Sequence, residues 1–175
     1  MSDPLVPVGV EFRSALPQEY EVIGQVTTQG FENGPYGKAT DPERIALLND
    51  AQGRAAAGDL LVAVSQGEVI GTATLLRPDT PYNRQARPDE AELRLVAVLP
   101  VARGRGVAAG LVDLAWRRAQ ENAANWGVTG LVLDAGERNV VAHRLYERCG
   151  FTRHPERERI HLPGLGQLLV YRKDL

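Results

Sequence analysis

The 175-residue sequence predicts a fold of the α/β class with some α+β character. In this fold, helices cover both faces of a mixed sheet. Apolar runs in the first half are joined by turn signals, which is typical of hairpins. Apolar runs in the second half alternate with helical patterns, which is typical of parallel crossovers. Apolar residues make up 43% of the chain, enough for the core of a single domain over residues 1–175.

The first half is expected to contain a strand, two helices and a hairpin, at residues 8–12, 17–29, 41–57, 60–64 and 69–76. Pro17 suits the first position of one helix, and Asp41 suits the cap of the other. A loop rich in Gly and Asn is expected at residues 30–40. Residues 77–89 contain three prolines and mixed charge, so we expect a mobile loop.

The second half is expected to alternate strand and helix, at residues 93–99, 106–125, 131–133, 140–149 and 168–172. One more strand is expected near residues 158–162. In the long helix, Val107, Leu111 and Leu114 fall on one side, as a buried face requires. Gly150 follows the second helix as its stop.

The composition excludes several classes of protein. The formal net charge of −2 gives no general attraction for nucleic acid or an anionic membrane. The single cysteine, Cys149, cannot form an intrachain disulfide, and the three histidines are spaced irregularly, so we expect no metal site. Residues 1–10 lack a signal-peptide pattern, and no stretch has the ~20 apolar residues that span a bilayer. We expect a soluble cytoplasmic protein.

The most informative segment is a strand followed by a short glycine loop and a long helix. Gly104 and Gly106 lie in the loop, between and beside Arg103 and Arg105. A helix N-terminus presents free N–H groups and about half a positive charge, and glycines allow an anion to approach closely. The loop therefore predicts a pyrophosphate site, although glycines that merely ease a tight β–α turn remain an alternative.

Two other phosphate-binding motifs fit less well. The P-loop needs Lys-Ser/Thr after its last glycine, but Val107 and Ala108 follow Gly106. The dinucleotide fingerprint tolerates Ala109 at its last position, yet its strand should open a βαβ unit. Here a hairpin precedes the strand, and the acidic residue on the next strand, Asp134, lies 28 residues after Gly106, further than the usual interval of about 20 residues.

The segment resembles the acetyl-CoA-binding motif of the GNAT superfamily of N-acetyltransferases, Q/R-x-x-G-x-G/A. Arg103-Gly-Arg-Gly106 supplies its glycines, while Val101 stands where the strict motif has Gln or Arg, as in many bacterial members. Residues 139–151 resemble the family signature N-x-x-A-x-x-L-Y-x-x-x-G-F. The resemblance covers residues 60–151 well. It implies a mixed, mostly antiparallel sheet of six to seven strands with helices on both faces.

The resemblance also implies how acetyl-CoA would be held. The strand before the glycine loop separates from its neighbour in this family, and its backbone pairs with the pantetheine arm. The loop and helix start hold the pyrophosphate, and an Asn side chain contacts the cofactor, although Asn139 could simply cap its helix. The implied cofactor-binding residues are Val96, Ala97, Val98, Arg103, Gly104, Arg105, Gly106, Val107, Ala108, Asn139 and Tyr146.

Tyr146 is the first catalytic candidate. Coenzyme A leaves as a thiolate with a pKa near ~8.5, and a nearby phenol can donate a proton or hydrogen bond to it. The alternative is a core tyrosine on a short amphipathic helix, because Leu145 and Phe151 are close in sequence. The family signature around Tyr146 favours the catalytic role.

Glu92 is the second catalytic candidate. A lysine-like amine with a pKa of ~10.4 is almost fully charged at pH 7, and its neutral form costs roughly 4.6 kcal/mol. A carboxylate can accept that proton, and some family members carry a base at this place on the strand. The alternative is an ion pair with Arg94, two residues further on the same side of the strand. Glu90 is a weaker rival for the base.

The sequence therefore predicts an N-acetyltransferase that moves the acetyl group of acetyl-CoA to a primary amine by direct attack in a ternary complex. No convincing covalent nucleophile is visible, since Cys149 has no His-Asp arrangement beside it. A non-catalytic acyl-CoA-binding sensor or scaffold is the alternative, and the presence of both Tyr146 and Glu92 favours the enzyme. The acceptor, a small-molecule or peptide amine, the length of the acyl group and a homodimer are left open.

Overall fold

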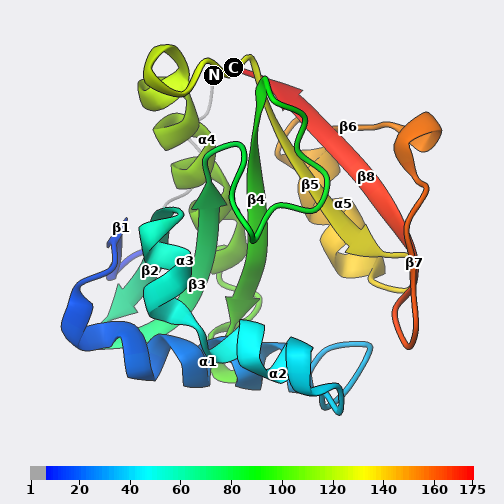
Figure 1. The fold of residues 1–175 in the computed structure, drawn as a ribbon. Coiled ribbons are helices and arrows are strands. Elements are labelled where there is room, and N and C mark those ends of the chain that lie inside the picture. Colours follow the sequence, from blue (N-terminus) through cyan, green and yellow to red (C-terminus); the bar gives the residue numbers. More distant parts are fainter. Residues whose placement is uncertain (1–6) are drawn as a thin grey trace.

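In a computed structural model, which describes residues 7–175, the chain forms one eight-stranded sheet in the order β1-β2-β3-β4-β5-β8-β6, with β7 paired to β8 (Figure 1). Every pair of neighbouring strands is antiparallel except β4 and β5, which are parallel. The strands are β1 (Val10–Ser14), β2 (Gly58–Ser65), β3 (Glu68–Leu76), β4 (Glu90–Val98), β5 (Gly130–Gly136), β6 (Thr152–Arg153), β7 (His161–Leu162) and β8 (Gly166–Asp174).

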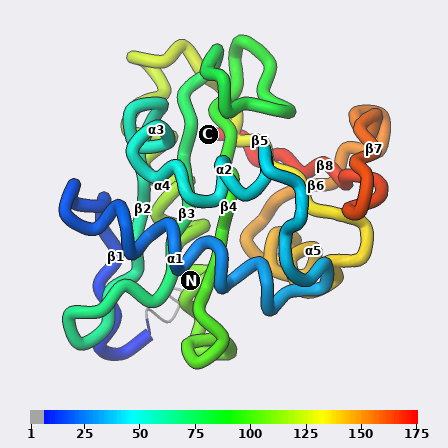
Figure 2. The backbone as a smooth tube through the Cα atoms, turned by 60° about the horizontal axis from the view of Figure 1, so that its bottom comes forward, coloured from blue at the N-terminus to red at the C-terminus, as the bar shows by residue number. Residues whose placement is uncertain are grey.

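The helices cover both faces of this sheet, as Figure 2 shows from a second direction. The α-helices are α1 (Tyr20–Glu32), α2 (Pro42–Asn49), α3 (Ala51–Ala56), α4 (Val107–Trp126) and α5 (Val140–Arg148). Three short 3₁₀ turns are η1 (Pro17–Glu19), η2 (Pro100–Ala102) and η3 (Pro155–Arg157). Helices α1 and α3 lie against one face, and α4 and α5 against the other.

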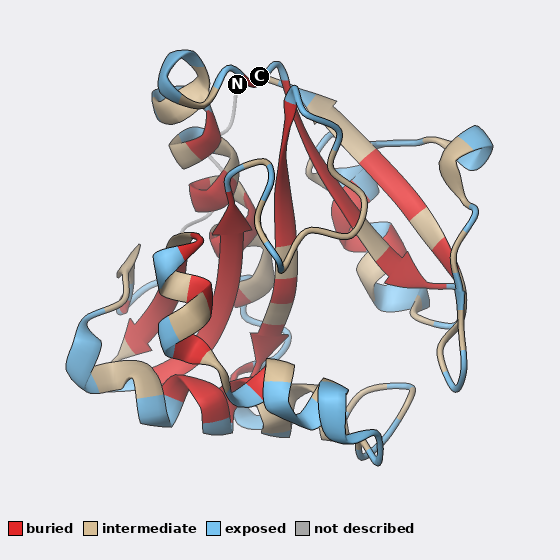
Figure 3. Cartoon of the chain, viewed as in Figure 1, coloured by how far each residue is buried: buried red, intermediate tan, exposed pale blue. Residues whose placement is uncertain are grey.

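Alternation along β2 explains why both faces are covered. Leu61 and Ala63 point into the cluster that contains α4, whereas Leu60 and Val62 point into the cluster that contains Ile23 of α1. Successive side chains of a strand point to opposite faces, so a strand that is apolar at every position needs helices on both. Figure 3 shows the buried strands between helices whose outer surfaces are exposed.

The predicted fold class and the mostly antiparallel sheet are confirmed, with three local differences. The sheet has eight strands rather than six to seven: β7 is the strand expected near residues 158–162, and β6 is additional, because its two residues show no periodicity. The helix expected at residues 41–57 is broken at Asp50, whose side chain accepts the N–H of Gly53 and starts α3. The helix expected at residues 17–29 begins as η1 and continues to Glu32.

The parallel pair β4 and β5 creates the space for a site. Only three residue pairs join these strands, Glu90–Gly130, Ala91–Leu131 and Glu92–Val132, and beyond them the strands separate (Figure 1). At the same level the register between β4 and β3 shifts, and Leu95 has a φ of 54°. Such a bulge with a left-handed non-glycine residue is typical of functional sites.

The sequence predicts no signal peptide at residues 1–10. Residues 1–6 of this segment lie outside the part of the chain that the structure describes. Among residues 7–175, no helix combines the length and the apolarity that crossing a bilayer requires.

Candidate active site

The separation of β4 and β5 opens a cavity of about 630 Å³. Its walls come from β4, the starts of α4 and α5, the end of β5, and the end of α1 with the loop after it. Ten residues expected at the site line it: Val96, Ala97, Val98, Arg103, Gly104, Gly106, Val107, Ala108, Asn139 and Tyr146. The tertiary structure therefore brings together the two sequence motifs, while Arg105 and Glu92 do not line the cavity.

The glycine loop forms one end of the cavity wall, and its backbone N–H groups have no hydrogen-bond acceptor in the described chain. Gly104 and Gly106 have φ values of 74° and 79°, which a residue with a Cβ adopts only under strain. After Arg103, the next backbone N–H that donates a hydrogen bond is that of Gly110, which donates to Gly106 O at 3.0 Å. Within the described chain, the N–H groups of residues 104–109 have no acceptor. This arrangement at the start of a 20-residue helix fits a pyrophosphate.

The two arginines of the loop differ in what they contact. The Arg103 guanidinium donates to Gly30 O and Asn33 O, both at 2.9 Å, and so holds the last carbonyls of α1 against the loop. Arg105 is exposed and makes no hydrogen bond with a described residue. The sequence predicts that both arginines add positive charge to a phosphate site at this loop. The geometry shows Arg103 already engaged and Arg105 free.

The backbone of β4 faces the cavity at alternate residues. Leu99 N–H donates to Ile70 O of β3, so by alternation Ala97 also directs its polar groups toward β3. Val96 and Val98 then direct theirs to the other side, where β5 has separated. An extended arm with amide groups could pair with them as an added strand does.

Asn139 and Tyr146 each combine a structural contact with a place in the cavity wall. The Asn139 side chain accepts the N–H of Ala142 at 3.2 Å, so it caps α5 while it lines the cavity. The Tyr146 ring packs on Phe151 and Tyr171, with centroids 6.2 and 6.0 Å away. Burial, together with the charge of Asp134, raises the pKa of Tyr146 well above its usual value. Its hydroxyl is therefore protonated at neutral pH, as a proton donor must be.

The Glu92 carboxylate is fully buried beneath the loop of residues 77–89. It accepts the backbone N–H groups of Arg84, Gln85 and Ala86, at 2.8, 3.1 and 3.1 Å. It forms no ion pair with Arg94, which donates instead to Tyr82 O at 2.6 Å. The ion pair expected between Glu92 and Arg94 is therefore not formed. The geometry assigns it the anchoring of this loop, and its role as a base stays a prediction without support from its position.

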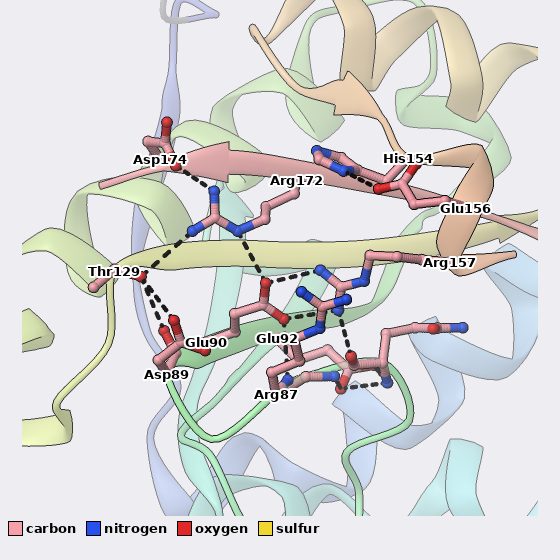
Figure 4. Close-up of polar contacts among 12 residues, drawn as sticks. Arg87, Asp89, Glu90, Glu92, Thr129, His154, Glu156, Arg157, Arg172 and Asp174 are labelled. Carbon is pink, nitrogen blue, oxygen red and sulfur yellow. Dashed lines mark hydrogen bonds and ion pairs between the residues drawn. The ribbon is translucent and has the colours of Figure 1, made fainter.

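Glu90, the weaker rival, is the first residue of the same strand, two residues before Glu92, and lies in an ion-pair network (Figure 4). Its carboxylate contacts Arg157 at 2.8 Å and Arg172 at 2.9 Å. Burial opposes ionisation of Glu90, but Arg157, the Arg87 N–H and Arg172 together hold its pKa below the usual value. A carboxylate so paired is a poor proton acceptor, and it joins β4 to the segment before β7.

The end of the cavity away from the glycine loop contains charged residues that the sequence did not single out as functional. Asp134 lies on β5, nearly buried, and accepts bonds from Arg84 Nε and Gln85 Nε2, both at 2.9 Å. Arg44 of α2 and Arg94 of β4 line the same cavity. Asp134 and Arg94 interrupt apolar strands, a signal that could have identified them.

The loop after α1 reaches across to the start of α5. Tyr36 Oη accepts the N–H of Arg138 at 2.9 Å, and the Arg138 guanidinium lies 4.7 Å from the centre of the Tyr36 ring. Both residues line the cavity, so the loop expected at residues 30–40 forms part of its wall. Cys149, by contrast, does not line it, and burial raises the pKa of its thiol, which disfavours the reactive thiolate.

Comparison with known families gives a match over most of the chain. The model of the family described as "Acetyltransferase (GNAT) family" matches residues 21–151. This range contains the glycine loop and the signature around Tyr146. It excludes β1 and the whole segment from β6 to β8.

Curated relatives agree with this match. N-acetylaspartate synthetase of Danio rerio is 36% identical over 106 residues, which are 59% of this chain but 33% of that protein. An uncharacterised N-acetyltransferase of Mycobacterium tuberculosis is 30% identical over 122 residues, 65% of this chain and 70% of that protein. The chain thus spans about a third of the length of the first relative.

Solved structures share the fold at low identity. Ribosomal-protein-alanine N-acetyltransferase from Brucella melitensis has a TM-score of 0.69 at 21% identity, covering 94% of this chain and 99% of its own. The structure of yncA from Salmonella typhimurium, with its cofactor acetyl-CoA, has a TM-score of 0.66 at 18% identity, covering 95% and 94%.

Proposed function

The chain belongs to the GNAT acetyltransferase family, and we propose that it transfers the acetyl group of acetyl-CoA to a primary amine by direct attack in a ternary complex. The predicted class of acyltransferase is confirmed at the level of the family. The observation that carries the proposal is one cavity that joins the free N–H groups of residues 104–109 to the protonated hydroxyl of Tyr146.

The cofactor would lie along β4. The N–H groups of residues 104–109 would bind the pyrophosphate, and the backbone of Val96 and Val98 would pair with the pantetheine amides. Asn139 would contact the cofactor from the start of α5. In this arrangement the thioester would lie near the point where β4 and β5 separate, beside Tyr146 and Asp134.

Transfer begins when the neutral amine nitrogen attacks the thioester carbonyl. The carbon–sulfur bond breaks, and Tyr146 donates its proton to the departing thiolate. The proton that the nitrogen releases as it becomes an amide returns Tyr146 to its protonated form, so this half of the reaction balances. Before the attack, the ammonium form of the amine must also lose a proton, which costs roughly 4.6 kcal/mol for a lysine-like amine at pH 7 and much less for an amine with a pKa of about 8. Glu92 stays the predicted acceptor of that proton, with water as the route that its burial would require.

The test is thiol release from acetyl-CoA with a panel of amines: free amino acids including L-aspartate, which the name of the Danio rerio relative suggests, polyamines, and peptides with free N-termini. We expect turnover with at least one of them and thermal stabilisation of the protein by acetyl-CoA alone. Stabilisation without turnover for any amine would favour the alternative, a non-catalytic acyl-CoA sensor. Absence of stabilisation would contradict both functions.

A further inference from the structure

We infer that the amine acceptor is a free amino acid whose carboxylate is bound by the cluster of Arg44, Arg84 and Arg94 at the acceptor end of the cavity. This inference rests on the proposed acetyl transfer and names the class of its acceptor. Three distant segments supply the cluster: α2, the loop of residues 77–89, and β4. All three side chains line the same cavity.

The cluster lies too far from the glycine loop to serve the pyrophosphate. Arg94 precedes Val98 by four residues on β4, which corresponds to roughly 13 Å at ~3.3 Å per residue, and the loop begins beyond Val98. Arg84 contacts Asp134 on β5, beside the point where the two strands separate. The cluster is therefore near the predicted thioester, where an acceptor must place its amine.

The cluster has more positive charge than the described residues neutralise. Asp134 balances Arg84, but no carboxylate of residues 7–175 lies within 4.0 Å of a nitrogen of Arg44 or Arg94. Arg94 uses one nitrogen on the carbonyl of Tyr82, and Arg44 lies over the Phe31 ring at 5.3 Å from its centre. The nearby Glu92 carboxylate accepts hydrogen bonds from backbone N–H groups of the loop instead of pairing with either arginine.

Burial and mutual repulsion make this excess charge costly. Burial lowers the pKa of Arg94 to about 10, with a further contribution from Arg84, and it lowers the pKa of Arg44 in the same way. Partly buried guanidiniums without a counter-ion are unfavourable, and a bound carboxylate would relieve the cost. A planar guanidinium binds carboxylate in a bidentate manner, so the cluster also suits the shape of this group.

The cluster is held in place before any ligand arrives. Arg84 is fixed by two bonds to Asp134, and its own N–H is fixed by Glu92. Tyr82, whose carbonyl orients Arg94, donates its hydroxyl to Asp50 between α2 and α3. In a free amino acid the carboxylate is two bonds from the amine, so a carboxylate on the cluster keeps the amine close to β4. A peptide N-terminus has an amide at that position and lacks this charge.

The experiment compares each amino acid with its own α-carboxamide as acceptor, using the full chain, acetyl-CoA and thiol release. Both members of a pair have an α-amine, and only the acid has the carboxylate. We expect kcat/KM for the acids to exceed that for the amides by about 10- to 100-fold, the range of a charged hydrogen-bonded contact. The pKa of each amine is measured, and rates are compared per neutral amine.

Arg44→Gln and Arg94→Gln test the cluster itself, with Arg87→Gln as the matched control. Arg87 lies in the same loop region, is exposed, and does not line the cavity, so its loss changes net charge equally. We expect each cluster variant to raise KM for the acid about 10-fold or more, to leave KM for the amide unchanged, and to keep acetyl-CoA binding. Arg44 lies on an outer helix, so its variant remains informative if Arg94→Gln folds poorly.

Two results would overturn the inference while the proposed function stands: amides that react as well as acids, or cluster variants that behave like Arg87→Gln. A preference for peptide N-termini over free amino acids would also overturn it. If acetyl-CoA binds but no amine reacts, polyamines and peptides included, the proposed function fails, and the inference fails with it.

Discussion

The two ends of the cavity are built in different ways. At the proposed cofactor end the candidate binding groups are backbone N–H donors, contributed by one continuous segment, residues 104–109. At the acceptor end they are charged side chains from α2, the loop of residues 77–89, β4 and β5. The cofactor end therefore needs particular backbone angles and small residues, whereas the acceptor end needs particular side chains in a particular tertiary arrangement.

Because the two ends are built differently, different kinds of substitution should impair them. A backbone cradle tolerates changes of side chain but fails when a Cβ forces the chain out of the left-handed region. A network of side chains fails when one partner is lost, because the others remain buried without compensation.

The largest effect is expected for Gly106→Val. Gly106 has a φ of 79°, and a β-branched residue there would displace the N–H groups of the loop. We expect the affinity for acetyl-CoA to fall by about 100-fold or more, roughly 2.7 kcal/mol, in calorimetry. Gly67→Val is the control, because Gly67 has a φ of 80° in the β2–β3 turn, outside the cavity. If both variants bind acetyl-CoA as the original chain does, the backbone cradle is not the cofactor site.

Tyr146→Phe tests the proposed proton donor, which lies between the two ends of the cavity. It should lower kcat by about 10- to 10³-fold with little change in acetyl-CoA affinity, since only the proton donor is lost. Because burial raises the pKa of Tyr146, its hydroxyl keeps its proton as the pH rises, and no loss of activity from its ionisation is expected below about pH 10. The measurement is kcat against pH with one good acceptor.

The matched control is Tyr171→Phe. Tyr171 is also buried, and its ring lies 6.0 Å from that of Tyr146, but it does not line the cavity. Equal losses of kcat in the two variants would show that Tyr146 acts through packing alone.

Glu92→Gln tests whether the acceptor end contains a base or an anchor. The amide group would face the N–H donors of Arg84, Gln85 and Ala86, so stability should fall by about 1–3 kcal/mol in urea unfolding. As an anchor, Glu92 should affect a high-pKa and a low-pKa amine alike, with parallel profiles of kcat/KM against pH.

A base predicts a different pattern for Glu92→Gln. The loss would be greatest near neutral pH with the high-pKa amine and would shrink as the free amine becomes abundant. Glu90→Gln is the control, because it removes a buried carboxylate of the same strand that pairs with Arg157 and Arg172 away from the cavity. It should lower stability without any dependence of turnover on the amine.

The smallest effects are expected for the two loop arginines. Arg103→Met loses its bonds to Gly30 O and Asn33 O, so it should lower the melting temperature by a few degrees, about 1 kcal/mol, and leave acetyl-CoA affinity within about twofold. Arg105→Met should instead lower the affinity about three- to tenfold and reduce its salt dependence. The opposite pattern would place Arg103, not Arg105, on the phosphates.

Prediction from the sequence succeeded where a feature is local. The strand, glycine loop and helix around Gly104 and Gly106 were placed within a few residues, because glycines and apolar periodicity are read along the chain. The break at Asp50 was missed, although its side chain caps α3, because the apolar pattern continues across it. The strand expected near residues 158–162 is present as β7, whereas the sequence analysis does not predict β6, because two residues show no period.

Long-range contacts explain the remaining differences at the site. Glu92 and Arg94 alternate as a surface pair would, but nothing in the sequence near them shows that Arg84 and Tyr82 return to meet them. The sequence analysis considers Asp134 only as the possible acidic residue of a dinucleotide-binding motif. In the structure it accepts a hydrogen bond from Arg84, fifty residues earlier in the chain.

The sequence by itself determined the fold class, the glycine loop at the start of α4 and the position of Tyr146 on α5, because each depends on groups within a short stretch of backbone or on a single helix. Only the tertiary structure decided which side chains surround the acceptor. The separation of β4 and β5 after three residue pairs creates the cavity, and the return of residues 77–89 over Glu92 sets the positions of Arg84 and Arg94. Charges become a binding site only when folding removes them from water and brings them within hydrogen-bond distance, and neither condition can be seen in the order of residues.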